Sequence, residues 1–219
     1  MRGGAASAAI ALLAAVAALA GCGDARQSAP ARPLGPEGLG RALALTRADG
    51  RMAMHLKATT TRPGRGTRPQ FDADGELDLG ASAGTATLHL DGFAGVPDYT
   101  VAWTADRVKV GGRTFPRERA RTDGGQLGLL PDETQGLAEL VAVAEDVRER
   151  GNGHWTFTVT PEAAARRGIP PQPQSGRVWR GEAWAASDGR LRRVQITLPT
   201  PALGATIPAG VATLALTLD

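Results

Sequence analysis

The sequence has a single cysteine, Cys22, few aromatic residues and only two lysines, Lys57 and Lys109. One cysteine excludes an internal disulfide, so a folded domain must be held together by its apolar core alone. The formal net charge of +3 is small and dispersed along the chain, which argues against a nucleic-acid partner. No glycine-rich phosphate loop leads from a strand pattern into a helix pattern, so we predict no cofactor.

The N-terminal segment has the three parts of a secretory signal in the expected order. Arg2 provides the positive charge, the apolar run 8–20 follows, and the run ends in Leu19-Ala20-Gly21-Cys22, which matches the lipobox cleaved by lipoprotein signal peptidase. The run is shorter than the roughly 20 apolar residues that span a bilayer. We therefore predict a signal peptide over residues 1–21 and lipid modification of Cys22. The alternative is an ordinary secreted protein in which this cysteine is incidental.

Lipidation would place the protein on the extracytoplasmic face of the cell membrane. Each buried methylene contributes about 0.8 kcal/mol, so one acyl chain holds a protein weakly whereas two or three hold it stably. Residues 22–35 are rich in Pro, Gly, Ser and Ala, a composition typical of a flexible tether. Residues 36–219 are expected to form one domain, because their number suits a single core and no later segment is apolar enough to span a membrane.

The hydrophobic periodicity of this domain indicates an α+β fold. Apolar residues one turn apart predict a helix over residues 36–48 that ends at Asp49-Gly50. A second helix is predicted from a cap at Asp132 to Arg150, closed by Gly151–Gly153. Elsewhere the apolar period is two, which is typical of an antiparallel meander with one wet face. We expect a short helical turn at 161–167 and strands near residues 52–57, 71–79, 86–90, 99–103, 108–110, 154–160, 178–185, 191–198 and 211–218.

The apolar face of this sheet predicts a possible internal cavity. A single antiparallel sheet of this many strands must curl, and its inner face has Met, Leu, Val and Ala in place of bulky aromatic residues. Met52 and Met54 are flexible enough to adapt to a ligand. The alternative is a closed core filled by the same side chains. The candidate cavity-lining residues are Met52, Met54, Leu56, Phe71, Leu77, Leu79, Leu88, Leu90, Tyr99, Val101, Trp103, Val108, Val110, Leu137, Leu140 and Val141.

Several short motifs follow one another in an order that is typical of a known family. After the helix and the meander come Pro131-Asp132, Gly136-Leu137-Ala138-Glu139-Leu140, His154-Trp155-Thr156-Phe157-Thr158-Val159, Pro161-Glu162-Ala163-Ala164, Val178-Trp179 and Ser187-Asp188-Gly189-Arg190-Leu191-Arg192-Arg193-Val194. In this order they resemble the LppX/LprG lipoproteins of actinobacteria, which share a fold with LolA and RseB. The chain departs from that pattern at Val108-Lys109-Val110, where those proteins tend to have an aromatic residue followed by a basic one.

The resemblance implies a strongly curved antiparallel β-sheet, a half-open β-barrel, with helices covering its concave face. It implies a cavity that holds the acyl chains of a lipid or lipoglycan, and no catalytic residues. A membrane transporter or another envelope protein would be the partner that exchanges this lipid. A second hypothesis, taken from the RseB-like relatives, is a non-enzymatic sensor or scaffold that binds a protein partner through the same fold.

An esterase and a metal site were also considered from the sequence. Gly80-Ala81-Ser82-Ala83-Gly84 fits the nucleophile elbow of hydrolases, but that motif needs a following helix and a strand is expected here. A run of alternating acids lies on one strand, where alternate side chains point the same way into solvent and lack the spacing of a calcium loop. No ligand spacing links the three histidines. The residues concerned are Asp72, Asp74, Glu76, Asp78, His55, His89 and His154.

Two arginine clusters are the remaining candidates for ligand contact. They lie at residues 117–121 and 190–193. A guanidinium pairs with phosphate through two hydrogen bonds, so these clusters could meet anionic headgroups. Ordinary surface charge is the simpler interpretation.

Overall fold

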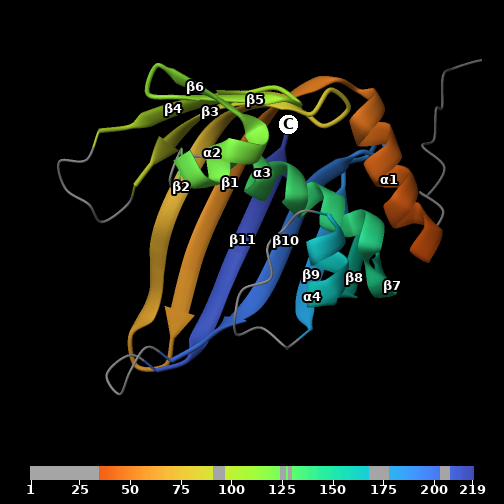
Figure 1. Ribbon diagram of the computed structural model, residues 1–219. Coiled ribbons are helices and arrows are strands. Elements are labelled where there is room, and N and C mark those ends of the chain that lie inside the picture. The colour runs from red at the N-terminus through yellow and green to blue at the C-terminus, as the bar shows by residue number, and fades with distance from the viewer. Residues whose placement is uncertain (1–34, 91–96, 124–126, 128–129, 168–177, 203–207) are drawn as a thin grey trace, which may run out of the picture. The chain divides into compact units, whose positions relative to one another are not determined.

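The computed structural model describes residues 35–90, 97–123, 127, 130–167, 178–202 and 208–219. Within them, an 11-stranded antiparallel sheet has the order β6-β5-β4-β3-β2-β1-β11-β10-β9-β8-β7 (Figure 1). The sheet is strongly bent, its two edge strands do not pair, and the helices lie over its concave side (Figure 1). The predicted α+β fold with a half-open β-barrel is therefore confirmed.

The first half of the sheet is a meander in which each strand pairs with the next one along the chain. Alternation of buried and exposed residues is clearest in the first of these strands, as the sequence pattern predicted. The strands are β1 (Arg51–Arg62), β2 (Gly66–Asp78), β3 (Ala83–His89), β4 (Tyr99–Trp103), β5 (Arg107–Val110) and β6 (Arg113–Pro116).

The second half is another meander, which runs from the opposite edge back to the middle of the sheet. Its strands are β7 (Glu145–Gly151), β8 (His154–Val159), β9 (Trp179–Ala185), β10 (Leu191–Thr200) and β11 (Gly210–Leu218). β11 then pairs with β1, with Leu216 opposite Leu56. The first and last strands of the chain thus lie side by side (Figure 1), and this pairing joins the two meanders.

The helices are short apart from the first. They are α1 (Pro36–Ala48), α2 (Arg117–Asp123), α3 (Leu130–Glu139), the 3-10 helix η2 (Leu140–Val143) and α4 (Pro161–Arg166). α4 begins where the sequence favours it, because Pro161 occupies its first turn and the Thr160 hydroxyl accepts a hydrogen bond from the Ala163 N–H at 3.2 Å. None of the helices in the described part of the chain combines the length and the apolar content that a membrane crossing needs.

The predicted helix from Asp132 to Arg150 is wrong at both ends. Helix α3 begins at Leu130, so Asp132 lies inside its first turn, and residues 145–151 form the edge strand β7. The cause is the Asn152-Gly153 pair, whose φ angles are +54° and +69°. Two consecutive positive φ angles between paired strands are typical of a type I′ hairpin turn, so these residues turn β7 into β8 and do not close a helix.

Candidate functional site

The inner face of the sheet is packed solid along one row of side chains. Leu56 on β1 lies opposite Leu216 on β11, which in turn lies opposite Val194 on β10. All three side chains are fully buried. On the other side of β1, Ala73 continues the row and is fully buried as well. The helices cover this level of the sheet, and no space for a ligand remains there.

One row further along the same strands, the burial decreases. Ala58 lies opposite Leu214, and Thr60 lies opposite Ala212. Leu214, Ala212 and Thr60 are only half-buried, as is Phe71 beside Ala58. These are inward-facing positions, so their exposure means that the helices do not reach this level. The concave face is therefore packed at the level of Leu56 and hollow at the level of Ala58 and Thr60.

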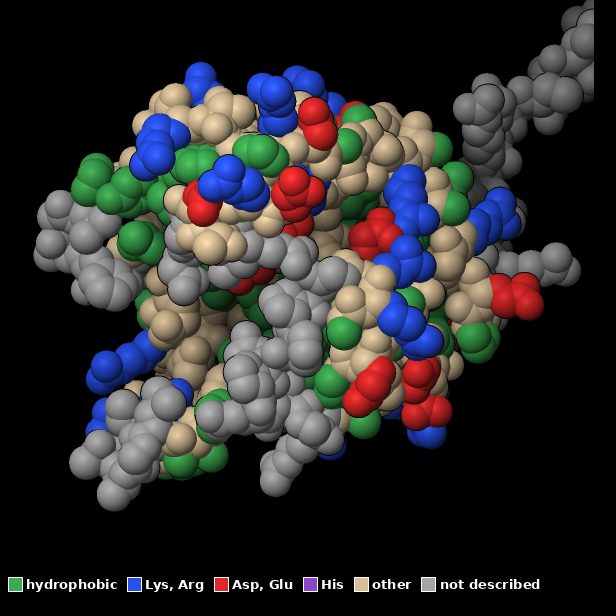
Figure 2. All heavy atoms as spheres, viewed as in Figure 1, with side chains coloured by type: hydrophobic (Ala, Val, Ile, Leu, Met, Phe, Trp, Pro, Cys, Tyr) green, Lys and Arg blue, Asp and Glu red, His purple; other side chains and the backbone are tan. Residues whose placement is uncertain are grey.

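The hollow end holds a cavity of about 410 Å³. Figure 2 shows the surface hollowed over the lower part of this face of the molecule. A volume of this size falls within the usual range for ligand pockets, about 300–1,000 Å³. The cavity is lined by Ala58, Thr59, Thr60, Gln70, Phe71, Leu88, Leu90, Leu130, Glu133, Leu198, Thr200, Ala212, Thr213 and Leu214.

Most of the lining comes from apolar side chains on strands far apart in the sequence. Phe71 lies on β2, Leu88 on β3 and Leu90 directly after β3. Leu198 and Leu214 come from β10 and β11 of the second meander. Polar lining is confined to hydroxyl and amide side chains and one carboxylate. An apolar wall with a few polar groups is the usual chemistry of a site for a greasy ligand.

The carboxylate is Glu133, which lies on α3 one turn after Leu130. Its side chain is exposed and borders the cavity, while protein atoms surround it on most other sides. Loss of surrounding water raises the pKa of Glu133 above its ordinary value of 4.5, and the neighbouring carboxylate of Asp132 raises it further.

Helix α3 is held in place by a polar network centred on Arg117. This guanidinium donates to Asp132 Oδ1 at 3.2 Å and to the carbonyl oxygens of Ser82 and Thr104 at 3.3 and 3.2 Å. It also donates to Gln135 Oε1, and the Gln135 amide donates to Ser82 Oγ at 2.8 Å. The network joins α3 to two hairpin turns, so the helix that carries Glu133 has a fixed position over the sheet.

Ser82, the candidate nucleophile of the hydrolase motif, belongs to this network. Its hydroxyl takes a hydrogen bond from an amide, and strand β3 follows it directly, as the sequence predicted. His55 and His89 lie on the convex face, opposite the buried row. The described residues therefore do not assemble the strand, nucleophile and helix arrangement that the hydrolase motif requires.

The acidic residues of β2 lie on the convex face, where they pair with bases. Asp74 contacts His55 Nδ1 at 2.8 Å and His89 Nε2 at 3.8 Å. Asp98 contacts His89 Nδ1 at 2.9 Å, and this hydrogen bond raises the pKa of His89 above 6.5, with smaller charge effects from nearby aspartates. Among the described residues, no group of three or more His, Cys, Asp or Glu side chains is arranged to hold a metal ion.

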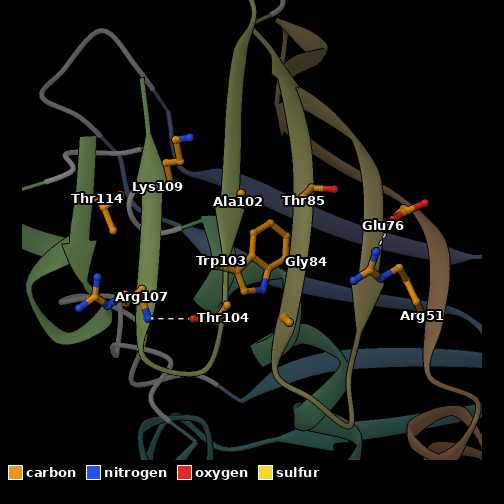
Figure 3. Close-up of a pocket in the computed structure, with 11 residues that line it drawn as sticks. Arg51, Glu76, Gly84, Thr85, Ala102, Trp103, Thr104, Arg107, Lys109 and Thr114 are labelled. Atoms are coloured by element: carbon orange, nitrogen blue, oxygen red, sulfur yellow. Dashed lines mark hydrogen bonds and ion pairs between the residues drawn. The ribbon is translucent and has the colours of Figure 1, made fainter. Parts of the chain in front are cut away.

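A second recess, of about 360 Å³, lies between Arg51 on β1 and Thr114 on β6 (Figure 3). It contains charges of both signs, including an ion pair of 3.4 Å between Arg51 and Glu76. Figure 3 shows the indole of Trp103 lying across Gly84. A Cβ atom at Gly84 would be 2.4 Å from the Trp103 ring, so only glycine allows the ring to lie there. We assign this recess no ligand.

The sequence-predicted lining residues fall into several environments. Phe71, Leu88 and Leu90 border the concave cavity, and Trp103 borders the second recess. Tyr99 and Val110 are half-buried on β4 and β5. Cys22 lies outside the described residues. The others are buried in the core: Met52, Met54, Leu56, Leu77, Leu79, Val101, Val108, Leu137, Leu140 and Val141.

Sequence reasoning missed the lining residues of the C-terminal strands and the start of α3. Leu198, Ala212 and Leu214 lie on strands that the alternating pattern had located, so that pattern was the available signal. The alternating pattern does not show that β11 pairs with β1, which is what brings these residues to the cavity. The sequence did not mark Glu133 as a cavity residue, because acidic residues are common in the first turn of any helix, where the helix dipole favours them.

The sequence matches no protein-family model and no curated protein. Among solved structures, this chain is similar to the lipoprotein LppX of Mycobacterium tuberculosis, with 15% identity and a TM-score of 0.44 over 84% of this chain and 94% of that one. It is also similar to a LolA superfamily protein of Nitrosomonas europaea, with 9% identity and a TM-score of 0.36 over 84% and 92% of the two chains.

Proposed function

We propose that this protein binds an acyl chain of a lipid or lipoglycan in the cavity on its concave face and carries or presents that lipid in the cell envelope. The observation that supports the proposal is the contrast along the inner face. The side chains in the row through Leu56 are fully buried, while the row through Ala58 borders an apolar cavity of about 410 Å³. The described residues leave this inward-facing apolar surface uncovered, and a bound ligand would cover it.

The cavity volume sets how much lipid it can hold. A methylene takes up roughly the 30 Å³ that one water molecule occupies in the liquid, so about 410 Å³ holds roughly a dozen methylenes. Burial of that many contributes on the order of 10 kcal/mol at about 0.8 kcal/mol each, before the entropic cost of association. We therefore expect one acyl chain to enter this cavity, with any second chain outside it.

The predicted anchor at Cys22 suits this function. A protein tethered to the extracytoplasmic face of the cell membrane meets lipids as they leave the bilayer, and a flexible segment over residues 22–35 would let the domain approach them. We propose that a membrane transporter or envelope protein delivers or receives the lipid. The cavity supports only the lipid-binding part of this proposal.

Protein purified from its host should carry lipid, which native mass spectrometry would detect as added mass. Ala212→Phe places a phenyl ring in the cavity, because Ala212 lines it. Ala215→Phe is a matched control on the same strand, since Ala215 lies opposite Lys57 on the convex face. The ring displaces at least two methylenes, so an uncharged fluorescent acyl probe should bind Ala212→Phe about tenfold more weakly.

The proposal fails if the purified protein is consistently empty and both phenylalanine variants bind the probe as the wild type does. In that case the sensor or scaffold hypothesis would take its place. Crosslinking in cells would then show one dominant protein partner, captured equally by wild type and Ala212→Phe.

A further inference from the structure

Glu133 is the one charged side chain among the described residues that line the concave cavity. The cavity wall is otherwise built from apolar side chains, threonines and Gln70. A carboxylate in such surroundings is costly to keep unless a ligand or another residue satisfies it. The chain holds it there by fixing α3 through Arg117, which bonds to Asp132 and Gln135 and leaves Glu133 facing the cavity.

No described lining residue is a lysine, arginine or histidine. A phosphate, sulfate or carboxylate headgroup inside the cavity would therefore receive no cation from the described lining and would lie beside a carboxylate of the same sign. Asp132, the preceding residue on α3, is paired with Arg117, so Glu133 is the charge that faces the cavity. A zwitterionic headgroup has the same difficulty, because its phosphate would find no cation among the described lining residues.

Hydroxyl groups complete the polar part of the wall. Thr60 and Thr200 line the same cavity, and the Thr200 Oγ1 atom is buried without a hydrogen-bond partner among the described residues. A threonine hydroxyl beside a ligand space can donate to an ester or hydroxyl oxygen. The described lining thus offers one carboxylate acceptor, several hydroxyl groups and no cationic side chain.

We propose that Glu133 selects the polar group of the ligand, and that this cavity takes an uncharged acyl lipid with a free hydroxyl group, such as an acylglycerol, and excludes anionic lipids. The inference rests on the proposed lipid-binding function. The ligand hydroxyl donates to the Glu133 carboxylate, and the acyl chain lies along Phe71, Leu198 and Leu214.

Three probes with the same alkyl chain separate the elements of this inference: dodecanol, its methyl ether and dodecyl sulfonate below its micellar concentration. They are titrated against the mature chain with Cys22→Ser, which lacks the lipid anchor. Dodecanol should bind about tenfold more tightly than the ether, which cannot donate a hydrogen bond. In Glu133→Leu this ratio should fall to about one.

The sulfonate tests charge exclusion. Any apolar cavity disfavours a sulfonate, so the informative quantity is how its affinity relative to dodecanol changes between variants. This relative affinity should rise about tenfold in Glu133→Gln and further in Glu133→Lys, because removal of a like charge and then its reversal favour the anion. Glu162→Gln, which removes an exposed carboxylate from the first turn of α4, should leave it unchanged.

Two results would overturn the inference while leaving lipid binding intact. One is a relative affinity for the sulfonate that is the same in wild type, Glu133→Gln and Glu133→Lys. The other is an equal affinity of the wild type for dodecanol and its ether. If none of the three probes binds and Ala212→Phe has no effect on the acyl probe, the proposed function itself fails and the inference falls with it.

Discussion

Arg117 on α2 and Asp132 on α3 form a largely buried ion pair, in which Nε and Nη2 both lie 3.2 Å from Oδ1. Only 18% and 16% of the two side chains are exposed. The same guanidinium satisfies the carbonyl oxygens of Ser82 and Thr104. One side chain therefore connects the helix above the cavity with two turns of the sheet.

Replacement of Arg117 by Met should reduce the free energy of unfolding by about 2–4 kcal/mol, because it removes the hydrogen bonds that Arg117 makes to Asp132 and to two carbonyl groups. Urea denaturation measures this loss. Arg119→Met on the same helix is the control. Its partner Asp123 lies at 2.7 Å, but Arg119 is 67% exposed, so the loss there should be below about 0.5 kcal/mol. Equal losses in the two variants would contradict the role assigned to Arg117.

Gly84→Ala should destabilise the protein by about 1–3 kcal/mol. The new methyl group would lie 2.4 Å from the Trp103 ring and 2.6 Å from the carbonyl oxygen of Glu76, so the ring must move. Gly40→Ala, in α1, meets nothing within 4 Å and should stabilise by about 0.5–1 kcal/mol through higher helix propensity. Thermal unfolding followed by circular dichroism distinguishes the two. A stable Gly84→Ala with unchanged tryptophan fluorescence would refute the proposed contact.

Glu133 should make the folded protein less stable as the pH rises. The pKa of its carboxyl is higher in the folded state than its ordinary value of 4.5, so between these two values the folded state binds more protons than the unfolded state. The free energy of unfolding therefore decreases with rising pH across this window and becomes level above the folded pKa. The reference is Glu133→Gln, which cannot titrate and should lack this component.

The measurement is the difference in unfolding free energy between wild type and Glu133→Gln as a function of pH. Wild type should lose stability relative to the variant as the pH increases from 4.5. A difference that is independent of pH, or one that increases in favour of wild type, would mean that the carboxyl is not desolvated.

Cys22→Ser should abolish lipid attachment and leave the signal peptide uncleaved. Serine cannot form the thioether to a diacylglyceryl group, and lipoprotein signal peptidase cleaves at the lipidated cysteine. Cell fractionation and incorporation of labelled palmitate measure the effect. Retention of the label by the serine variant would rule out Cys22 as the site of lipid attachment.

The pattern of alternation predicted the sheet well because burial repeats every second residue on a strand. It located β1, with its buried Met52, Met54 and Leu56, and it placed His55 and Lys57 on the opposite face. It failed at Glu145–Gly151, where few apolar residues are present because β7 is an edge strand. The Asn152-Gly153 turn was the local signal for that strand.

The cavity was harder to predict than the sheet. Leu56 and Ala58 have the same inward orientation, yet only the level of Ala58 borders empty space. The difference depends on where α3 lies over the sheet, and Arg117 ties this helix to the turn at Ser82, which is 35 residues from Arg117 in sequence. Alternation reports which face a residue occupies and carries no information about what covers that face.

The pairing of β1 with β11 also governs when the domain can fold. β1 is made well before its neighbour, which contains Leu216 and Leu218. Such a pair closes a long loop of the chain, a contact that forms slowly. Until β11 has been made, the centre of the sheet lacks one of its two strands. A nascent chain of this topology therefore keeps its sheet open until β11 is available, and an open chain is what a secretion channel can thread.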